Sequence, residues 1–180
     1  MKTLGIIATI IVTLIAIVAI SYLIIGIFTI LKNGTSLTQT PGTIARLKVF
    51  LSNNSAETAK KAVFPELQTR QYAWPEDGFQ SFVKLLSNTA TTLNYELQEL
   101  TPTTTLNQTF DTETLLHFTV TTKYFKFIDD VYVRIKRNSE IITVNVKSQS
   151  RTGRADFGAN LANIRELFNQ LEQTITPASP

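Results

Sequence analysis

The sequence predicts an α+β fold: a two-layer sandwich in which an antiparallel sheet of about five strands is covered on one face by two helices, preceded by one N-terminal transmembrane helix. Three observations support this prediction. The chain begins with a long uncharged apolar segment, its middle contains segments in which apolar and polar residues alternate, and two further segments space their apolar residues at helical intervals. Alternation is typical of strands with one buried face, and helical spacing indicates amphipathic helices that can cover that face.

The N-terminal segment is long enough to cross a bilayer. No charged residue lies between Lys2 and Lys32, and a helix needs about 20 apolar residues to span a hydrocarbon core of about 30 Å. A cleaved signal peptide has an apolar region of only about 7–15 residues. We therefore expect the lipid bilayer to be the partner of residues 4–31, in a single-pass protein of the cell membrane. Because uncleaved anchors at the extreme N-terminus often deliver their domain outward, we expect the domain on the extracytoplasmic side.

The rest of the chain divides by composition. Residues 1–31 are expected to form the anchor, residues 32–63 a juxtamembrane linker rich in turn-forming residues, residues 64–175 the α+β domain, and residues 176–180 a tail. Within the linker, residues 55–63 are expected to form a helical turn or two.

The domain is predicted to open with a strand and a helix. Residues 67–74 are typical of a first strand, and Pro75 suits the first position of a helix, where its missing N–H costs nothing. The apolar residues that follow share one helical face; they are Phe79, Phe82, Val83 and Leu86.

Four strands and a second helix complete the order β-α-β-β-β-β-α. Apolar and polar residues alternate in four segments, 93–98, 115–120, 131–136 and 142–147, and Asn138-Ser139 predicts a hairpin turn. The last helix shows an apolar stripe formed by Leu161, Ile164, Leu167, Phe168 and Leu171.

The loop between the last strand and the last helix is the densest polar stretch of the domain, and it carries the candidate site residues. They are Ser148, Ser150, Arg151, Arg154, Asp156 and Asn160, with Asp129 and Asp130 from a neighbouring strand. Gly153 and Gly158 permit backbone conformations with positive φ, and Asp156 or Asn160 can cap the helix. The favoured interpretation is a structural network in which an arginine pairs with one of the aspartates. The alternative is an anion site, because a helix N-terminus with two arginines suits phosphate or carboxylate.

The same loop resembles a known family. Its pattern Ser-x-Ser-Arg-x-Gly-x-x-Asp-x-Gly-x-Asn, the segment 127–131 (Phe-Ile-Asp-Asp-Val, with Lys126 where the family usually has glycine) and the segment 64–68 are similar to motifs of domain-of-unknown-function family 1499, found in bacteria and plants. The resemblance covers about residues 56–171. It implies the fold and assigns no activity.

Other kinds of chemistry find little support in the sequence. Asp129 and Asp130 are adjacent in a strand and point to opposite faces, so no metal site is expected, and no cofactor or catalytic residue is assigned. His117 is expected to be an exposed strand residue, and the chain has no cysteine. Nucleic-acid binding is not expected because the basic residues are not clustered among aromatics. Basic residues at 134–137 are expected to lie at a solvated hairpin end, with contact to anionic headgroups as the alternative.

The sequence thus predicts a membrane-tethered, non-enzymatic binding or scaffolding module, for which a membrane protein is the partner considered. The alternative is an anionic-ligand-binding protein or an enzyme, with a small anionic ligand bound around Arg151, Arg154 and Asp156.

Overall fold

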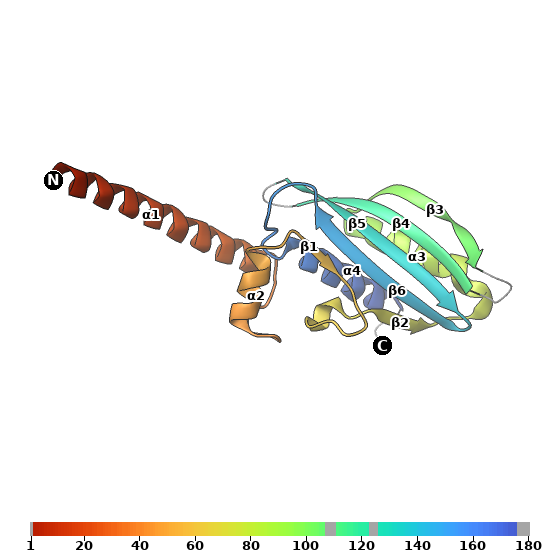
Figure 1. The fold of residues 1–180 in the computed structure, drawn as a ribbon. Helices are drawn as coiled ribbons and strands as arrows, with labels where there is room; N and C mark the ends of the chain where they lie inside the picture. The colour runs from red at the N-terminus through yellow and green to blue at the C-terminus, as the bar shows by residue number, and fades with distance from the viewer. Residues whose placement is uncertain (1, 107–110, 123–125, 176–180) are drawn as a thin grey trace.

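The structure, a computed structural model, describes residues 2–106, 111–122 and 126–175, and it confirms the α+β fold class (Figure 1). The predicted tail at 176–180 lies outside the described residues. The helices are α1 (Lys2–Lys32), α2 (Thr43–Phe50), η1 (Pro65–Leu67), η2 (Glu76–Gly78), α3 (Phe79–Thr92) and α4 (Ala159–Ile175), of which η1 and η2 are single 3-10 turns. The strands are β1 (Ser55–Glu57), β2 (Arg70–Ala73), β3 (Glu96–Leu106), β4 (Asp111–Thr121), β5 (Ile128–Asn138) and β6 (Ile141–Ser150).

The sheet is antiparallel and has six strands, in the order β1-β6-β5-β4-β3, with β2 also paired to β6. β1 and β2 share one edge because they pair with opposite ends of β6: Ser55 lies opposite Gln149, and Ala73 lies opposite Ile141. The expectation of a helical turn at 55–63 is therefore wrong at its start. Three residues are too few to show alternation, and β1 is held in place by its partner strand.

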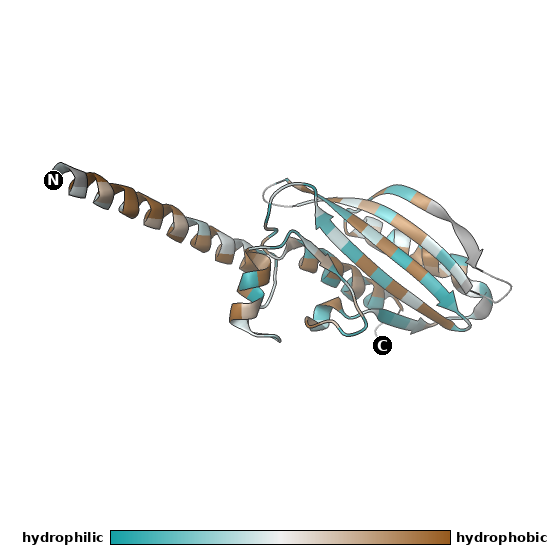
Figure 2. Ribbon diagram, in the orientation of Figure 1, coloured by the Kyte–Doolittle hydropathy of each residue, from teal (hydrophilic) through white to brown (hydrophobic). Residues whose placement is uncertain are grey.

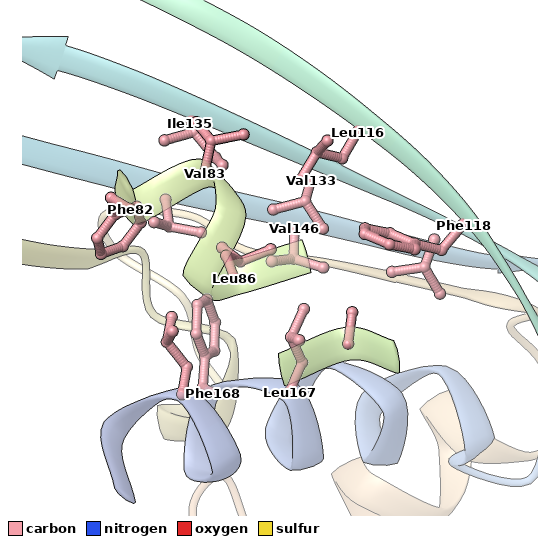
Figure 3. Packing of buried hydrophobic residues seen from close by; sticks show 14 of the residues in the cluster. Phe82, Val83, Leu86, Leu116, Phe118, Val133, Ile135, Val146, Leu167 and Phe168 are labelled. Carbon is pink, nitrogen blue, oxygen red and sulfur yellow. The ribbon is translucent and has the colours of Figure 1, made fainter. Parts of the chain in front are cut away.

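The core lies between the inner face of the sheet and helices α3 and α4 (Figure 3). Strand residues such as Phe118, Val133 and Val146 meet Leu86 of α3 and Leu167 of α4, and all five are almost fully buried. Alternating hydropathy along β5 and β6 is visible in Figure 2. The first predicted helix of the domain begins later than expected. Pro75 precedes the 3-10 turn η2, and α3 starts only at Phe79.

Helix α1 projects from one end of the domain (Figure 1). Its segment Gly5–Lys32 is long and apolar enough to span a membrane. The last turns of α1 are built into the domain, where Ile30 forms a second buried cluster with Phe50, Phe64 and Leu161.

The segment expected to be a linker, residues 32–63, contains α2 and β1 and contributes to this second cluster. Arg46 of α2 is fully buried, donates hydrogen bonds to the carbonyl oxygens of Ser36, Gln39 and Thr40, and pairs with Glu66 at 3.0 Å. In the sequence Arg46 looks like an ordinary surface charge, which is why this ordered structure was not expected.

Candidate functional site

The candidate loop begins where the inner face of the sheet changes from apolar to polar. In the register of β5 and β6, Asp129 lies opposite Ser150 and Val131 lies opposite Ser148. Ser148, Ser150 and Asp129 are all buried and face the start of α4. At the start of β5 and the end of β6, the inner face of the sheet thus presents hydroxyl and carboxyl groups to α4. Farther along these two strands the same face presents valine and isoleucine.

Asn160, in the first turn of α4, joins these groups. The Ser148 hydroxyl donates to Asn160 Oδ1 at 2.6 Å, and Asn160 Nδ2 donates to Ser150 Oγ at 3.0 Å and to the Asn54 carbonyl oxygen at 2.8 Å. Asn160 is fully buried, so each of these bonds replaces water. We call this set, with one further residue from α4, the inner polar network; its members are Asp129, Ser148, Ser150, Asn160 and Asn163.

Asp129 is the charged member of the inner polar network. Its Oδ2 accepts a hydrogen bond from Asn163 Nδ2 at 3.0 Å, and its Oδ1 has no hydrogen-bond partner in the described part of the chain. Burial raises the pKa of Asp129, while the nearby Ser150 hydroxyl and the Asn163 amide lower it in part. Asn163 also donates to Ser148 at 3.1 Å. Sequence reasoning missed Asn163, although a second asparagine one turn after Asn160, beside the apolar stripe, was the available signal.

Asp156 occupies the N-terminus of α4. Its Oδ1 accepts from the Gly158 N–H at 2.9 Å and its Oδ2 from the Asn160 N–H at 3.0 Å. Burial raises the pKa of Asp156, and these backbone N–H groups counteract part of that rise. A helix N-terminus attracts anions through its free N–H groups. Here the chain supplies that anion itself.

A second group of polar residues lies on the outer face of the sheet. Arg151 donates two hydrogen bonds to Asp130, from Nε to Oδ2 at 2.8 Å and from Nη2 to Oδ1 at 2.7 Å. His117 Nε2 lies 2.7 Å from the same Oδ1, and its ring stacks on Tyr132 with centroids 4.5 Å apart. The Arg151 guanidinium lowers the pKa of Asp130 to about 2. We call Arg151, Asp130, His117 and Tyr132 the outer cluster.

The candidate residues therefore separate into two groups, because Asp129 and Asp130 point to opposite faces, as the alternation predicts. The expected arginine–aspartate pair exists as Arg151–Asp130. Arg154 joins neither group: it is exposed, and no described residue pairs with it. Gly153 and Gly158 have φ of +89° and +80°, a conformation that favours glycine.

The loop also contacts the end of α1. The ring of Phe157 lies 5.7 Å from that of Tyr22, and its carbonyl oxygen accepts from Asn33 Nδ2 at 3.2 Å. Arg165 of α4 donates to the carbonyl oxygens of Asn33 and Gly34, which directly follow α1. Sequence reasoning did not connect these segments, which lie far apart in the chain.

The chemical capacity of this region is limited by how its polar groups are used. A cavity of about 30 Å³ lies between the loop and α1, lined in part by Thr29, Ser150 and Asp156; it is of a size for an ordered water molecule. Within residues 2–106, 111–122 and 126–175, no three His, Asp or Glu side chains gather as metal ligands would.

Arg137, which was expected at a solvated hairpin end, is buried and donates to the carbonyl oxygens of Ser139 and Pro75.

Comparisons with known proteins agree with the resemblance seen in the sequence. Neither the curated proteins nor the solved structures gave a match. The family described as "Protein of unknown function (DUF1499)" matches residues 45–171, which include most of α2, all of β1 and the expected domain as far as residue 171. The match covers most of the chain, so the protein belongs to the DUF1499 family.

Proposed function

We propose that the protein is a membrane-tethered, non-enzymatic binding or scaffolding module. In this proposal α1 crosses the membrane once, and the domain lies on the extracytoplasmic side with one face of its sheet open to a partner. The observation that carries the proposal is the way α1 ends inside the domain. Ile30 is fully buried in the second cluster, and Arg165 and Asn33 bond α1 to the domain.

This attachment has a consequence for orientation. A flexible linker would let the domain rotate freely above the bilayer, whereas a helix that is part of the core fixes which surfaces face the membrane and which face away. A fixed orientation suits a module that must present a binding face to a neighbouring membrane protein.

The state of the candidate loop supports a non-enzymatic role over the anionic-ligand alternative. An anion site would use free N–H groups at the start of α4 and an unpaired arginine. Asp156 already accepts from two of those N–H groups, and Asp130 already neutralises Arg151. The remaining arginine, Arg154, does not line the cavity beside the loop.

The outer face of the sheet is the surface that we assign to a partner. A cleft of about 530 Å³ lies there, and its lining includes Tyr132, Arg134, Lys147 and the acidic Glu57. Arg134 pairs with Glu113 at 3.4 Å. The ring of Tyr132 and the Lys147 ammonium group suit a protein surface with acidic and aromatic groups.

Photo-crosslinking in intact membranes tests this proposal. A photoreactive residue at Arg134 or Lys147 should give a discrete protein adduct, and the same residue at Lys84, exposed on α3, should not. Adducts that are absent at both outer-face positions, or identical at Lys84, would contradict the binding role. Stabilisation of the full chain by phosphate, lost in Arg154→Ala, would favour the anionic-ligand alternative instead.

A further inference from the structure

The position of the bilayer edge follows from the burial of α1. Residues 5–25 of α1 are exposed on all sides, and burial begins at Gly26. At about 1.5 Å per residue these exposed residues span roughly the 30 Å of a hydrocarbon core. If α1 crosses the membrane, as the proposed function requires, the bilayer edge therefore lies near Tyr22 and Gly26, where Phe157 contacts the helix.

Two connections of the domain lie at this level. The cavity beside α1 is lined by Thr29 of the helix, by Thr122 and Phe127 of the β4–β5 connection, and by Thr152 of the β6–α4 loop. Figure 1 shows the end of β4, the start of β5 and the β6–α4 loop at the end of the sheet that is nearest α1. Thr122, Phe127 and Thr152 therefore lie at the level of the headgroup layer.

Three exposed basic residues without a carboxylate partner among the described residues lie at this end of the domain, although Glu96 and Glu166 are also exposed here, Glu166 paired with Arg165 at 3.5 Å. Lys32 ends α1, Lys126 lies in the β4–β5 connection and Arg154 in the β6–α4 loop; all three are exposed, and none forms an ion pair with a described residue. Two carboxylates of the nearby loop and strand are engaged, since Asp130 binds Arg151 and Asp156 caps α4. We call Lys32, Lys126 and Arg154 the basic end.

Two acidic residues are exposed at the opposite end of the domain. Asp77 precedes α3 and Glu140 lies in the β5–β6 hairpin, and both are exposed. The backbone of Glu140 is bonded to Trp74, so these acidic residues share the end of the domain that is farthest from α1.

Phe127 adds an apolar component to the basic end. It follows Lys126 directly and is 44% exposed. An aromatic ring beside basic side chains is typical of segments that lie in the membrane interface.

We propose that the basic end binds anionic lipid headgroups of the membrane that α1 crosses. Lys32, Lys126 and Arg154 contact lipid phosphates, and Phe127 lies at the level of the headgroups. This inference rests on the proposed function, because it needs α1 in the bilayer. It adds a ligand class, anionic lipid headgroups, to the proposed function. It also gives a role in lipid binding to Arg154, which belongs to neither the inner polar network nor the outer cluster.

The test uses the full chain in vesicles of phosphatidylcholine, with or without phosphatidylglycerol. Since the chain has no cysteine, a fluorophore can be placed at Thr152→Cys, in the loop, or at Asn138→Cys, at the far hairpin. Lipids with a nitroxide on the headgroup then report contact by quenching the fluorophore. We expect severalfold stronger quenching at position 152 than at 138, enhanced by phosphatidylglycerol and weakened by salt.

Charge reversal decides whether the basic residues cause the contact. A basic residue near an anionic surface contributes about fivefold to association, so the double variant Lys126→Glu, Arg154→Glu should lose the enhancement by phosphatidylglycerol. The matched variant Lys84→Glu, at an exposed position of α3, should keep it. Equal quenching at 152 and 138, or an enhancement that survives the double reversal, would overturn the inference. Failure of the chain to incorporate into vesicles at all would instead refute the proposed function.

Discussion

Gly26 of α1 lies against the ring of Phe157 at a distance that leaves no room for a side chain. A Cβ atom at position 26 would stand 3.1 Å from Phe157 Cε1 and 2.8 Å from Leu51 Cδ2. The close approach of helix and loop at this point brings the α1 backbone into the domain. The attachment of α1 therefore depends on a glycine for space rather than for backbone flexibility.

Gly26→Leu should loosen this attachment. Overpacking costs about 1–3 kcal/mol, so the melting temperature of the full chain in detergent should fall by several degrees. Gly5→Leu is the matched control, because nothing lies within 4 Å of that position, and it should leave the melting temperature unchanged. Equal effects of the two substitutions would mean that α1 does not pack on the domain as described.

The best truncation point should lie before Gly26 rather than after Leu31. A chain that starts at residue 26 keeps Ile30 in its cluster with Phe50 and Leu161, whereas a chain that starts at residue 32 loses it. Burial of an isoleucine side chain is worth about 1.5–3 kcal/mol. Urea unfolding should therefore show a higher midpoint for the longer chain, and identical midpoints would argue that Ile30 contributes nothing to the core.

Asn160→Ala should strongly destabilise the domain, and Arg154→Ala should not. The first substitution leaves Ser148, Ser150 and the Asn54 carbonyl without their common partner, at about 1–3 kcal/mol for each buried group left unsatisfied. Arg154 is exposed and unpaired among the described residues, so its loss should change stability by less than about 0.5 kcal/mol. Chemical denaturation of both variants checks this; a large loss with Arg154→Ala would point to a structural role that the geometry does not show.

The pair Arg151–Asp130 should make stability depend on acid pH. The pKa of Asp130 is lowered from 3.8 to about 2, chiefly by the hydrogen bonds from Arg151. A carboxyl group whose pKa is lowered in the folded state contributes stability that is present above its ordinary pKa and is lost as pH falls towards the lowered one. Between pH 4 and pH 2 the parent chain should therefore lose stability more steeply than Asp130→Asn. Parallel melting curves over this range would show that the pair contributes no stability. The comparison with Asp130→Asn is needed because burial raises the pKa of Asp129 and of Asp156, and these groups add stability as pH falls.

Much of the fold could be predicted from the sequence because it is encoded by periodicity. The alternation in β5 and β6 and the stripe of α4 are each long enough to fix both the type of element and its buried face. The same alternation predicts that Asp129 and Asp130 point to opposite faces.

What the sequence did not reveal depends on contacts between distant segments. β1 is three residues long and takes its conformation from β6, and Arg46 is buried because turn carbonyls of residues 36–40 surround it. Likewise, nothing local says that Asn163 binds Asp129 while Arg151 binds Asp130. Those partners are chosen by the packing of α4 on the inner face and by the path of the loop around the sheet edge.

A nitroxide scan along α1 in lipid vesicles tests the central claim most directly. Single cysteines are introduced at successive positions from 5 to 32, and the collision rates of each label with oxygen and with a water-soluble nickel complex are measured. A helix that crosses the bilayer and ends in the domain predicts high oxygen and low nickel accessibility on every side of the helix from about residue 6 to 24. It also predicts that labels at Thr29 and Ile30, whose side chains are buried, become inaccessible to both reagents. High nickel accessibility throughout residues 6–24 would contradict the membrane tether, and exposure of both Thr29 and Ile30 would contradict the fixed attachment of the domain.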